Sequence, residues 1–347
     1  DAETLLQRLR TVLVTYREAG GSEPIVLFHD AAHGEPLIDA LARFGPGLPA
    51  NVLPVAVNEI TQLGVEAWTA PVAWGAVAVR ALCSAKPKHE LTGVDRNVTI
   101  ANLLGQSLGY GADVCGVIEA DDPDILRSAL DGVKPGATTR KPANFLPLGT
   151  KRSLLRSTMV ELHRAAPAPV DCVAMPAAAP FGGIEVDVEG CTLCLSCVSA
   201  CPTGALSDSE NRPALYFSES ACVQCGLCAA TCPEQVITLV PQVDFQAWNA
   251  PRRAVKEEEP YNCIGCGKPF GTRSTIERIV AKLEGKHWMF AGENAKRLDL
   301  VRMCDNCRVD AVMNEGFDPY QASPRPAPRT TEDYLQARDT THKNKTV

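Results

Sequence analysis

Cysteine is the residue whose number and spacing carry chemical information in this chain. Of its 15 cysteines, twelve lie between positions 191 and 307 in groups built on C-x-x-C spacing. Thiolates at such short spacing are ligands for zinc or for iron-sulfur clusters, and the pattern is typical of a reducing compartment, where disulfides are rare. We therefore expect this region to bind metal through sulfur. The remaining cysteines lie in apolar sequence and are expected to be buried structural thiols: Cys83, Cys115 and Cys172.

Eight of these cysteines form two copies of one motif, C-x-x-C-x-x-C-x-x-x-C-P. The copies are offset by 31 residues, and the offset continues past the cysteines, since Ala205-Leu206 corresponds to Val236-Ile237. In this motif the first three cysteines bind one [4Fe-4S] cluster, and the fourth, just before proline, binds the other. One cluster should therefore take Cys191, Cys194, Cys197 and Cys232. The second cluster should take Cys222, Cys225, Cys228 and Cys201.

Residues 183–242 resemble the bacterial two-cluster ferredoxin family, with no departure from its cysteine pattern. The resemblance implies a βαβ-like pair of half-modules and the transfer of single electrons at low potential. The local charge agrees with a low potential, because residues 181–247 contain eight acidic residues and only Arg212 as a cation. Negative surroundings oppose the addition of an electron to a cluster.

Four further cysteines form two more C-x-x-C pairs, Cys263 with Cys266 and Cys304 with Cys307. Two such pairs supply the four thiolates of a closed structural site, for which zinc is the expected metal. The gap between the pairs is longer than in short zinc ribbons, so mononuclear iron, a third iron-sulfur cluster or an empty dithiol site stay open as alternatives. Since one helix near 276–283 and a strand at 288–290 form only a small core, we expect the metal to hold together a zinc-ribbon-like module over 248–317. His287 is expected to be a surface or packing residue.

Upstream of the cysteine-rich region, strand patterns alternate with helix patterns. Short apolar runs predict strands at 24–28, 52–57, 76–83, 114–119 and 145–148. Helical periodicity predicts helices at 4–16, 35–44, 98–108, 123–130 and 151–164. This alternation predicts an α/β domain over 1–165, with a doubly wound, flavodoxin-like parallel sheet covered on both faces.

The remaining boundaries follow from composition. The Pro/Ala-rich range 166–182 is predicted to be a linker, followed by the ferredoxin domain at 183–247. The range 318–347 is predicted to be a flexible tail, because its apolar content is low. The expected fold class is thus multidomain, α/β plus α+β.

A possible site in the α/β domain comprises His29, Asp30 and His33, which follow the first expected strand, where open parallel sheets bind ligands. No third catalytic group is identifiable, so we expect these residues to belong to a loop that caps a helix. The sequence lacks both G-x-G-x-x-G and G-x-x-x-x-G-K-[ST], so no dinucleotide or NTP site is predicted. FMN or FAD in a flavodoxin-like loop is a less favoured alternative, in which the flavin would split hydride electron pairs into single electrons.

Two further resemblances concern regions of the chain outside the ferredoxin repeat. The stretches 263–270 and 286–290, after the ferredoxin repeat, resemble those of ferredoxin-type proteins associated with bacterial molybdenum formate dehydrogenases. Residues 1–165 distantly resemble the small iron-sulfur subunit domain of methanogen-type hydrogenases, although the N-terminal cysteine motifs of that family are absent. These resemblances imply an electron-transfer component without catalysis of its own, acting with a redox partner such as a formate dehydrogenase. A maturation factor for a molybdenum or iron-sulfur enzyme is a further alternative.

Net charge and hydropathy indicate which kinds of partner the protein binds and where in the cell it is located. The formal net charge is -7 and no basic tract is present, which argues against a nucleic-acid partner. No apolar stretch reaches the roughly 18 to 20 residues that a membrane-spanning helix needs. The first residues lack a basic segment before an apolar one, so the protein is expected to be soluble. The cysteine pattern is that of a reducing compartment, so we expect a cytoplasmic location.

Overall fold

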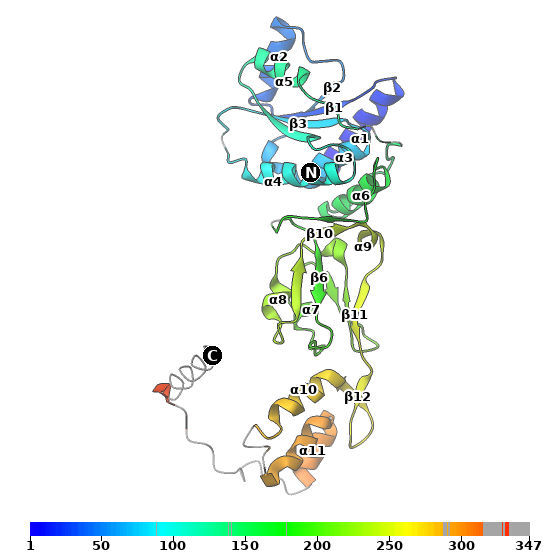
Figure 1. The fold of residues 1–347 in the computed structure, drawn as a ribbon, viewed down its shortest axis with the longest axis vertical. Helices are drawn as coiled ribbons and strands as arrows, with labels where there is room; N and C mark the ends of the chain where they lie inside the picture. Colours follow the sequence, from blue (N-terminus) through cyan, green and yellow to red (C-terminus); the bar gives the residue numbers. More distant parts are fainter. Residues whose placement is uncertain are drawn as a thin grey trace, which may run out of the picture. The chain divides into compact units, whose positions relative to one another are not determined.

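The structure, a computed structural model, describes residues 1–87, 89–137, 139, 141–177, 179–286, 290, 292–314, 328 and 330–332 (Figure 1). Contacts divide the chain into two compact units. The first unit consists of 1–186, 196–207 and 216–253, and the second consists of 187–195, 208–215 and the residues from 254 onward.

The first unit contains a parallel sheet of four strands in the order β2-β1-β3-β4. The strands are β1 (Ile25–His29), β2 (Val52–Ala56), β3 (Ala78–Cys83) and β4 (Cys115–Glu119). Ile25 pairs with Val52 on one side and with Ala78 on the other, and every residue of β1 is buried. The direction of winding changes between β1 and β3, which makes the carboxyl ends of these two strands the place where such sheets bind ligands.

Helices cover both faces of this sheet (Figure 1). They are α1 (Ala2–Glu18), α2 (Gly34–Phe44), α3 (Val65–Ala73), α4 (Thr92–Ser107), α5 (Pro123–Asp131) and α6 (Lys151–Arg164), with a short 3-10 helix η1 (Ile60–Gln62). Side chains alternate along β1, so Leu27 packs in a core with α2 and α5, while Phe28 packs in a larger core with α1, α3, α4 and α6. The sequence does not predict α3, because this helix is buried on all sides and therefore lacks an amphipathic pattern.

The expected fifth strand at 145–148 is not formed, and the parallel sheet has four strands. Phe145 instead stacks on Trp74, with ring centroids 4.9 Å apart, while Leu146 and Leu148 are more than half exposed. Pro147 has no N–H group to donate to a strand ladder. The apolar run therefore packs as an irregular segment through one aromatic side chain.

The rest of the first unit is built from short strands and helices. Strand β5 (Cys172–Ala174) pairs antiparallel with β10 (Gln242–Asp244), and β6 (Gly183–Val186) pairs antiparallel with β9 (Ile237–Val240). The other elements are α7 (Ser196–Ser199), β7 (Leu206–Ser207), η2 (Glu219–Ala221), α8 (Leu227–Thr231) and α9 (Phe245–Asn249). Two strands cross the unit boundary, β8 (Ala214–Phe217) and β11 (Arg253–Glu257). The range expected to be a linker, 166–182, thus contributes strand β5.

The three cysteines that belong to no cysteine group were all expected to be buried, and two of them are. Cys83 and Cys115 are buried, as predicted, but Cys172 is exposed. In β5 only the central residue, Val173, points into the core, and its two neighbours point outward because side chains alternate along a strand. The prediction that Cys172 is a buried thiol is therefore wrong.

The second unit contains the hairpin of β12 (Pro260–Asn262) and β13 (Pro269–Thr272), followed by α10 (Arg273–Leu283), the 3-10 helix η4 (Gly292–Arg302) and α11 (Asp305–Asn314). Its buried apolar residues include Ile276, Val280 and Leu298. Residues 287–289, which include His287 and most of the expected strand, lie outside the described residues, as does most of the expected tail. None of the helices in the described part of the chain combines the length and the apolar character needed to cross a bilayer.

Candidate iron-sulfur and metal sites

Four of the predicted cluster ligands line a single pocket in the first unit. The other walls of the pocket are largely apolar and include Ile184, Phe217 and Leu239. The cysteines that line it are Cys201, Cys222, Cys225 and Cys228. The structure thus places Cys201, from the first motif, with three cysteines of the second. Four thiols around one apolar pocket are a donor set that fits a [4Fe-4S] cluster.

Short elements hold these four cysteines in place. Cys222 ends η2, Cys228 lies in α8, and Cys225 lies on the loop between them. Cys201 follows α7, and α7 packs against α8. Because the two helices are in contact, the fourth cysteine of one motif reaches the loop of the other.

The sequence repeat is also a repeat of backbone conformation. Left-handed φ angles occur at Leu193, Leu195 and Gly204 in the first half, at 52°, 60° and 66°. They recur 31 residues later at Gln224, Gly226 and Gln235, at 54°, 78° and 54°. Non-glycine residues seldom adopt a positive φ. Such turns direct successive N–H groups to one side of a loop, which suits an anionic group such as a thiolate-bound cluster.

Hydrogen bonds and burial act in opposite directions on these thiols. Partial burial would raise the pKa of Cys201, but backbone N–H groups of Leu206, Thr203 and Ala205 hold it below its usual value. Burial raises the pKa of the Cys222 and Cys228 thiols. Gln224 donates from its backbone N to Cys222 Sγ at 3.5 Å. The pocket therefore supplies N–H donors to sulfur, as cluster-binding loops do.

The other four predicted ligands lie on the corresponding elements. Cys191 and Cys194 lie on the loop before α7, Cys197 lies within α7 and is buried, and Cys232 directly follows α8. Their assignment to one cluster stays a prediction based on the repeat. Cys194 and Cys225, which are equivalent in the two motifs, are both exposed.

Among the residues that the structure describes, two cations donate hydrogen bonds to carbonyl oxygens of motif cysteines, and the sequence gives no sign of them. Arg152 Nη2 donates to the carbonyl oxygen of Cys222 at 2.5 Å, and Lys256 Nζ donates to that of Cys191 at 2.5 Å. Both come from outside the range 181–247, in which Arg212 is the only basic residue. The local charge of the motifs is therefore less negative than the sequence of that range suggests.

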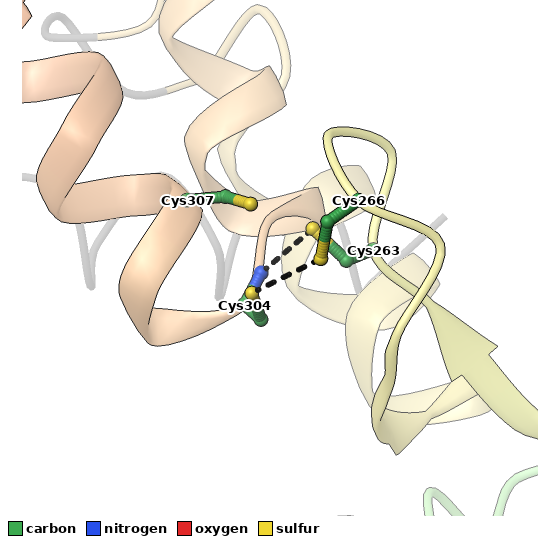
Figure 2. A group of neighbouring side chains, drawn as sticks. All are labelled: Cys263, Cys266, Cys304 and Cys307. Carbon is green, nitrogen blue, oxygen red and sulfur yellow. Dashed lines mark hydrogen bonds between the residues drawn. The ribbon is translucent and has the colours of Figure 1, made fainter.

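The four remaining paired cysteines come together in the second unit (Figure 2). One sulfur from each of them lies within 4.8 Å of all the others: Cys263, Cys266, Cys304 and Cys307. The first pair lies on the loop between β12 and β13, while Cys304 precedes α11 and Cys307 lies within it. This confirms the expectation that the two distant C-x-x-C pairs form one group.

The dimensions of this group suit one metal ion. A tetrahedral ion with metal–sulfur distances of 2.3 Å separates its sulfurs by about 3.8 Å, and Cys266 Sγ lies 3.7 Å from Cys304 Sγ. A four-iron cluster would hold its ligand sulfurs further apart, because the cubane lies between them. Burial would raise the pKa of Cys263, but N–H groups of Cys304, Cys266 and Gly265 lower it to about 6. These donors favour the thiolate form that a metal requires.

His29, Asp30 and His33, the possible active-site residues of the α/β region, make structural contacts around the start of α2. Asp30 Oδ1 accepts hydrogen bonds from His33 N at 2.6 Å and Gly34 N at 3.0 Å, which caps α2. His33 Nε2 lies 2.8 Å from Ala120 O, and His29 is buried at the end of β1. The expectation that this loop caps a helix is confirmed. Asp30 and His33 also border a cavity of about 250 Å³ at the carboxyl ends of β1 and β3.

Comparison with known proteins identifies the cysteine-rich region. Residues 190–237 match the family model of the 4Fe-4S dicluster domain. This part of the chain is a ferredoxin-type iron-sulfur domain. The matched range contains both motifs, from Cys191 to Cys232, so an electron-transfer role follows from the chemistry of such clusters.

Several curated proteins are similar to parts of the chain. A 58-residue stretch is 43% identical to the polyferredoxin-like subunit of aliphatic sulfonate oxidoreductase from Pyrococcus furiosus, covering 16% of this chain and 33% of that protein. A 93-residue stretch is 39% identical to the archaeal-type glutamate synthase (NADPH) of Thermotoga maritima, covering 27% and 17% of the two chains. An 84-residue stretch is 33% identical to the polyferredoxin protein MvhB of Methanothermobacter marburgensis, covering 20% of each. The chain therefore spans a third or less of the length of these relatives.

Proposed function

We propose that this protein relays single electrons through two [4Fe-4S] clusters to or from a partner oxidoreductase. One cluster is held by Cys191, Cys194, Cys197 and Cys232. The other is held by Cys222, Cys225, Cys228 and Cys201. The observation that carries the proposal is that Cys201 shares a pocket with three cysteines of the other motif. This is the ligand exchange that a two-cluster ferredoxin requires.

Two of the eight motif cysteines are exposed, which supports exchange of electrons with a partner protein. Cys194 and Cys225 would each place one edge of a cluster near solvent. Each cluster accepts or returns one electron per step, and the protein forms or breaks no substrate bond. The sequence resemblance suggests a formate dehydrogenase as the partner, and the Pyrococcus relative supports a role as an oxidoreductase subunit.

We further propose that Cys263, Cys266, Cys304 and Cys307 bind one structural zinc ion. The close approach of their sulfurs and the small core around Ile276 and Val280 support this role. A closed site of four thiolates leaves no position for a substrate. The ion would therefore stabilise the second unit and take no part in electron transfer.

The test is metal and sulfide analysis of the protein purified without oxygen, with EPR spectra of the dithionite-reduced form. The proposal requires about eight irons, eight sulfides and one zinc per chain, with signals from two interacting reduced clusters. About four irons would contradict it. Co-purification in a fixed ratio with an active oxidoreductase supports the relay, whereas association with the apo-enzyme alone would indicate a maturation factor.

A further inference from the structure

Arg152, on α6, is a partly buried cation that contacts the loop of the second motif. Its guanidinium donates three hydrogen bonds, all to backbone carbonyl oxygens. Nε donates to Ser220 O at 2.7 Å, Nη1 to Pro180 O at 3.0 Å, and Nη2 to Cys222 O at 2.5 Å. Its guanidinium carbon lies 5.5 Å from the ring centroid of Trp248, which is fully buried. These contacts fix the charge beside the first cysteine of the motif.

Among the described residues, Arg152 has no carboxylate at ion-pair distance. The adjacent Lys151 lies 3.8 Å from Glu66. The buried carboxylate of Glu219 accepts hydrogen bonds from Gln242 Nε2 and Asp244 N. Withdrawing a cation from water without a counter-charge costs free energy, even where the burial is partial. The position of Arg152 therefore points to an anion that completes this site.

The first motif has an equivalent cation, but its charge is already paired. Lys256 Nζ donates to Cys191 O at 2.5 Å, and Cys191 occupies the place in the first motif that Cys222 has in the second. The same Nζ lies 2.9 Å from Glu258 Oε1, and these two side chains are 11% and 15% exposed. The Lys256–Glu258 pair adds no net charge, whereas Arg152 adds a full positive charge. The two motifs are thus equivalent in ligands and unequal in charge.

We propose that Arg152 is the counter-charge of the second cluster and gives that cluster the higher reduction potential of the two. This inference rests on the proposed function. A [4Fe-4S] cluster with four thiolate ligands is an anion, and it gains one more negative charge when it accepts an electron from a partner protein. A nearby unpaired cation therefore favours the reduced form. Arg152 is a positioning residue that acts through its charge and takes no part in bond formation.

The asymmetry would give electron flow a direction within the chain. An electron delivered by a donor protein to either cluster would settle on the second cluster, because its reduced form is the more stable one. From there it would pass to an acceptor protein of higher potential. The first cluster, with the paired Lys256 beside it, would be the site of transient reduction.

The test is a potentiometric titration of the full-length, cluster-loaded protein, monitored by EPR. Three variants are compared with the wild type: Arg152→Gln, Arg152→Lys and Arg156→Gln. Arg156 is the matched control, since it lies one turn further along α6 and its Nε donates to Trp248 O at 3.3 Å instead of to a cysteine. The EPR signal of the second cluster is assigned by its loss in Cys201→Ala.

The wild type should show two unequal midpoint potentials. Arg152→Gln should lower the higher one by roughly a tenfold change in the reduction equilibrium, the effect of a unit charge within about 10 Å at an effective dielectric constant near 20. For a one-electron couple this is 59 mV. Arg152→Lys should keep most of the wild-type potential, and Arg156→Gln should shift either potential much less than Arg152→Gln does.

Equal potentials in the wild type would overturn the inference without reference to any variant. So would an equal shift of both clusters in Arg152→Gln, or the same shift in Arg156→Gln. If Arg152→Gln does not retain its clusters, the potential of the second cluster in Arg152→Lys tests the inference. Only a role through charge predicts that lysine keeps this potential close to the wild-type value. Eight irons with unshifted potentials would contradict the role of Arg152 alone, whereas about four irons in the wild type would contradict the proposed function itself.

Discussion

Leu195 and Gly226 occupy the same place in the two cysteine motifs, 31 residues apart, and both have a left-handed backbone, with φ of 60° and 78°. One position has a side chain and the other has none, yet the conformation is the same. The left-handed backbone at this place therefore belongs to the motif and does not depend on a glycine being present. This is the conformational counterpart of the sequence repeat.

Replacing Gly226 with valine should destabilise the second motif. A Cβ atom there would meet Leu239 Cδ1 at an ordinary 3.6 Å, so the cost lies in the backbone. We expect about 1–2 kcal/mol for Gly226→Val and less for Gly226→Asn, because asparagine tolerates a left-handed φ. The midpoint temperature at which visible cluster absorbance is lost measures the effect. The interpretation is wrong if the valine and asparagine variants lose their clusters at the same temperature.

Removing half of the four-cysteine group should unfold the part of the second unit from β12 to α11, which contains none of the eight proposed cluster ligands, and leave the iron-sulfur content intact. In Cys304→Ser/Cys307→Ser the two remaining thiolates cannot hold a closed tetrahedral ion, and the small core does not compensate. We expect about one zinc fewer per chain and faster hydrogen exchange in α10 and α11. Cys172→Ser is the control, because that thiol is exposed and lies outside the group. Unchanged exchange in α10 and α11 would refute a structural role for the ion.

Glu66 should make the α/β region less stable as pH rises. Burial raises the pKa of this carboxyl, although Lys151 Nζ, 3.8 Å from it, acts in the opposite direction. Since its folded-state pKa lies above the unfolded value, near 4.5, the penalty for ionising Glu66 grows from about that pH until the folded-state pKa is passed. Above that point the penalty is constant.

The matching measurement compares Glu66→Gln with the wild type in urea unfolding at pH 5.5 to 8, followed by tryptophan fluorescence. Trp68 and Trp74 lie in and directly after α3, the helix that carries Glu66, and report on this region. Glu66→Gln should be the more stable protein at pH 8, with a smaller advantage at pH 5.5. A pH-independent difference between the two proteins would show that titration of Glu66 is not the cause.

The sequence predicts the α/β alternation and the cysteine groups well, because both depend on local patterns. Four of the five expected parallel strands form, since each is a continuous apolar run bounded by turns. The run at 145–148 fails because an apolar run does not reveal whether it joins a sheet or packs through one aromatic ring, as Phe145 does on Trp74. Helix α3 is missed for the opposite reason, since full burial removes the periodic signal.

The cations around the motifs could not be predicted from the sequence. Arg152 precedes Cys222 by 70 residues, and Lys256 follows Cys191 by 65. Only the packing of α6 against α9 and the path of β11 bring these side chains to the cysteine loops. The cysteine ligands can be predicted from the sequence because they lie close together along the chain. The charges that would change the reduction potentials of the clusters come from distant segments.

Cysteine alkylation in Cys201→Ala, mapped by mass spectrometry, tests whether Cys201 binds the cluster of the second motif. The account predicts that losing Cys201, a member of the first motif, frees the thiols of the second motif, because these residues share one pocket. The thiols that should become alkylated are Cys222, Cys225 and Cys228. Protection should persist at Cys191, Cys194, Cys197 and Cys232. Alkylation of Cys191, Cys194 and Cys197 instead, with the second motif still protected, would contradict the account.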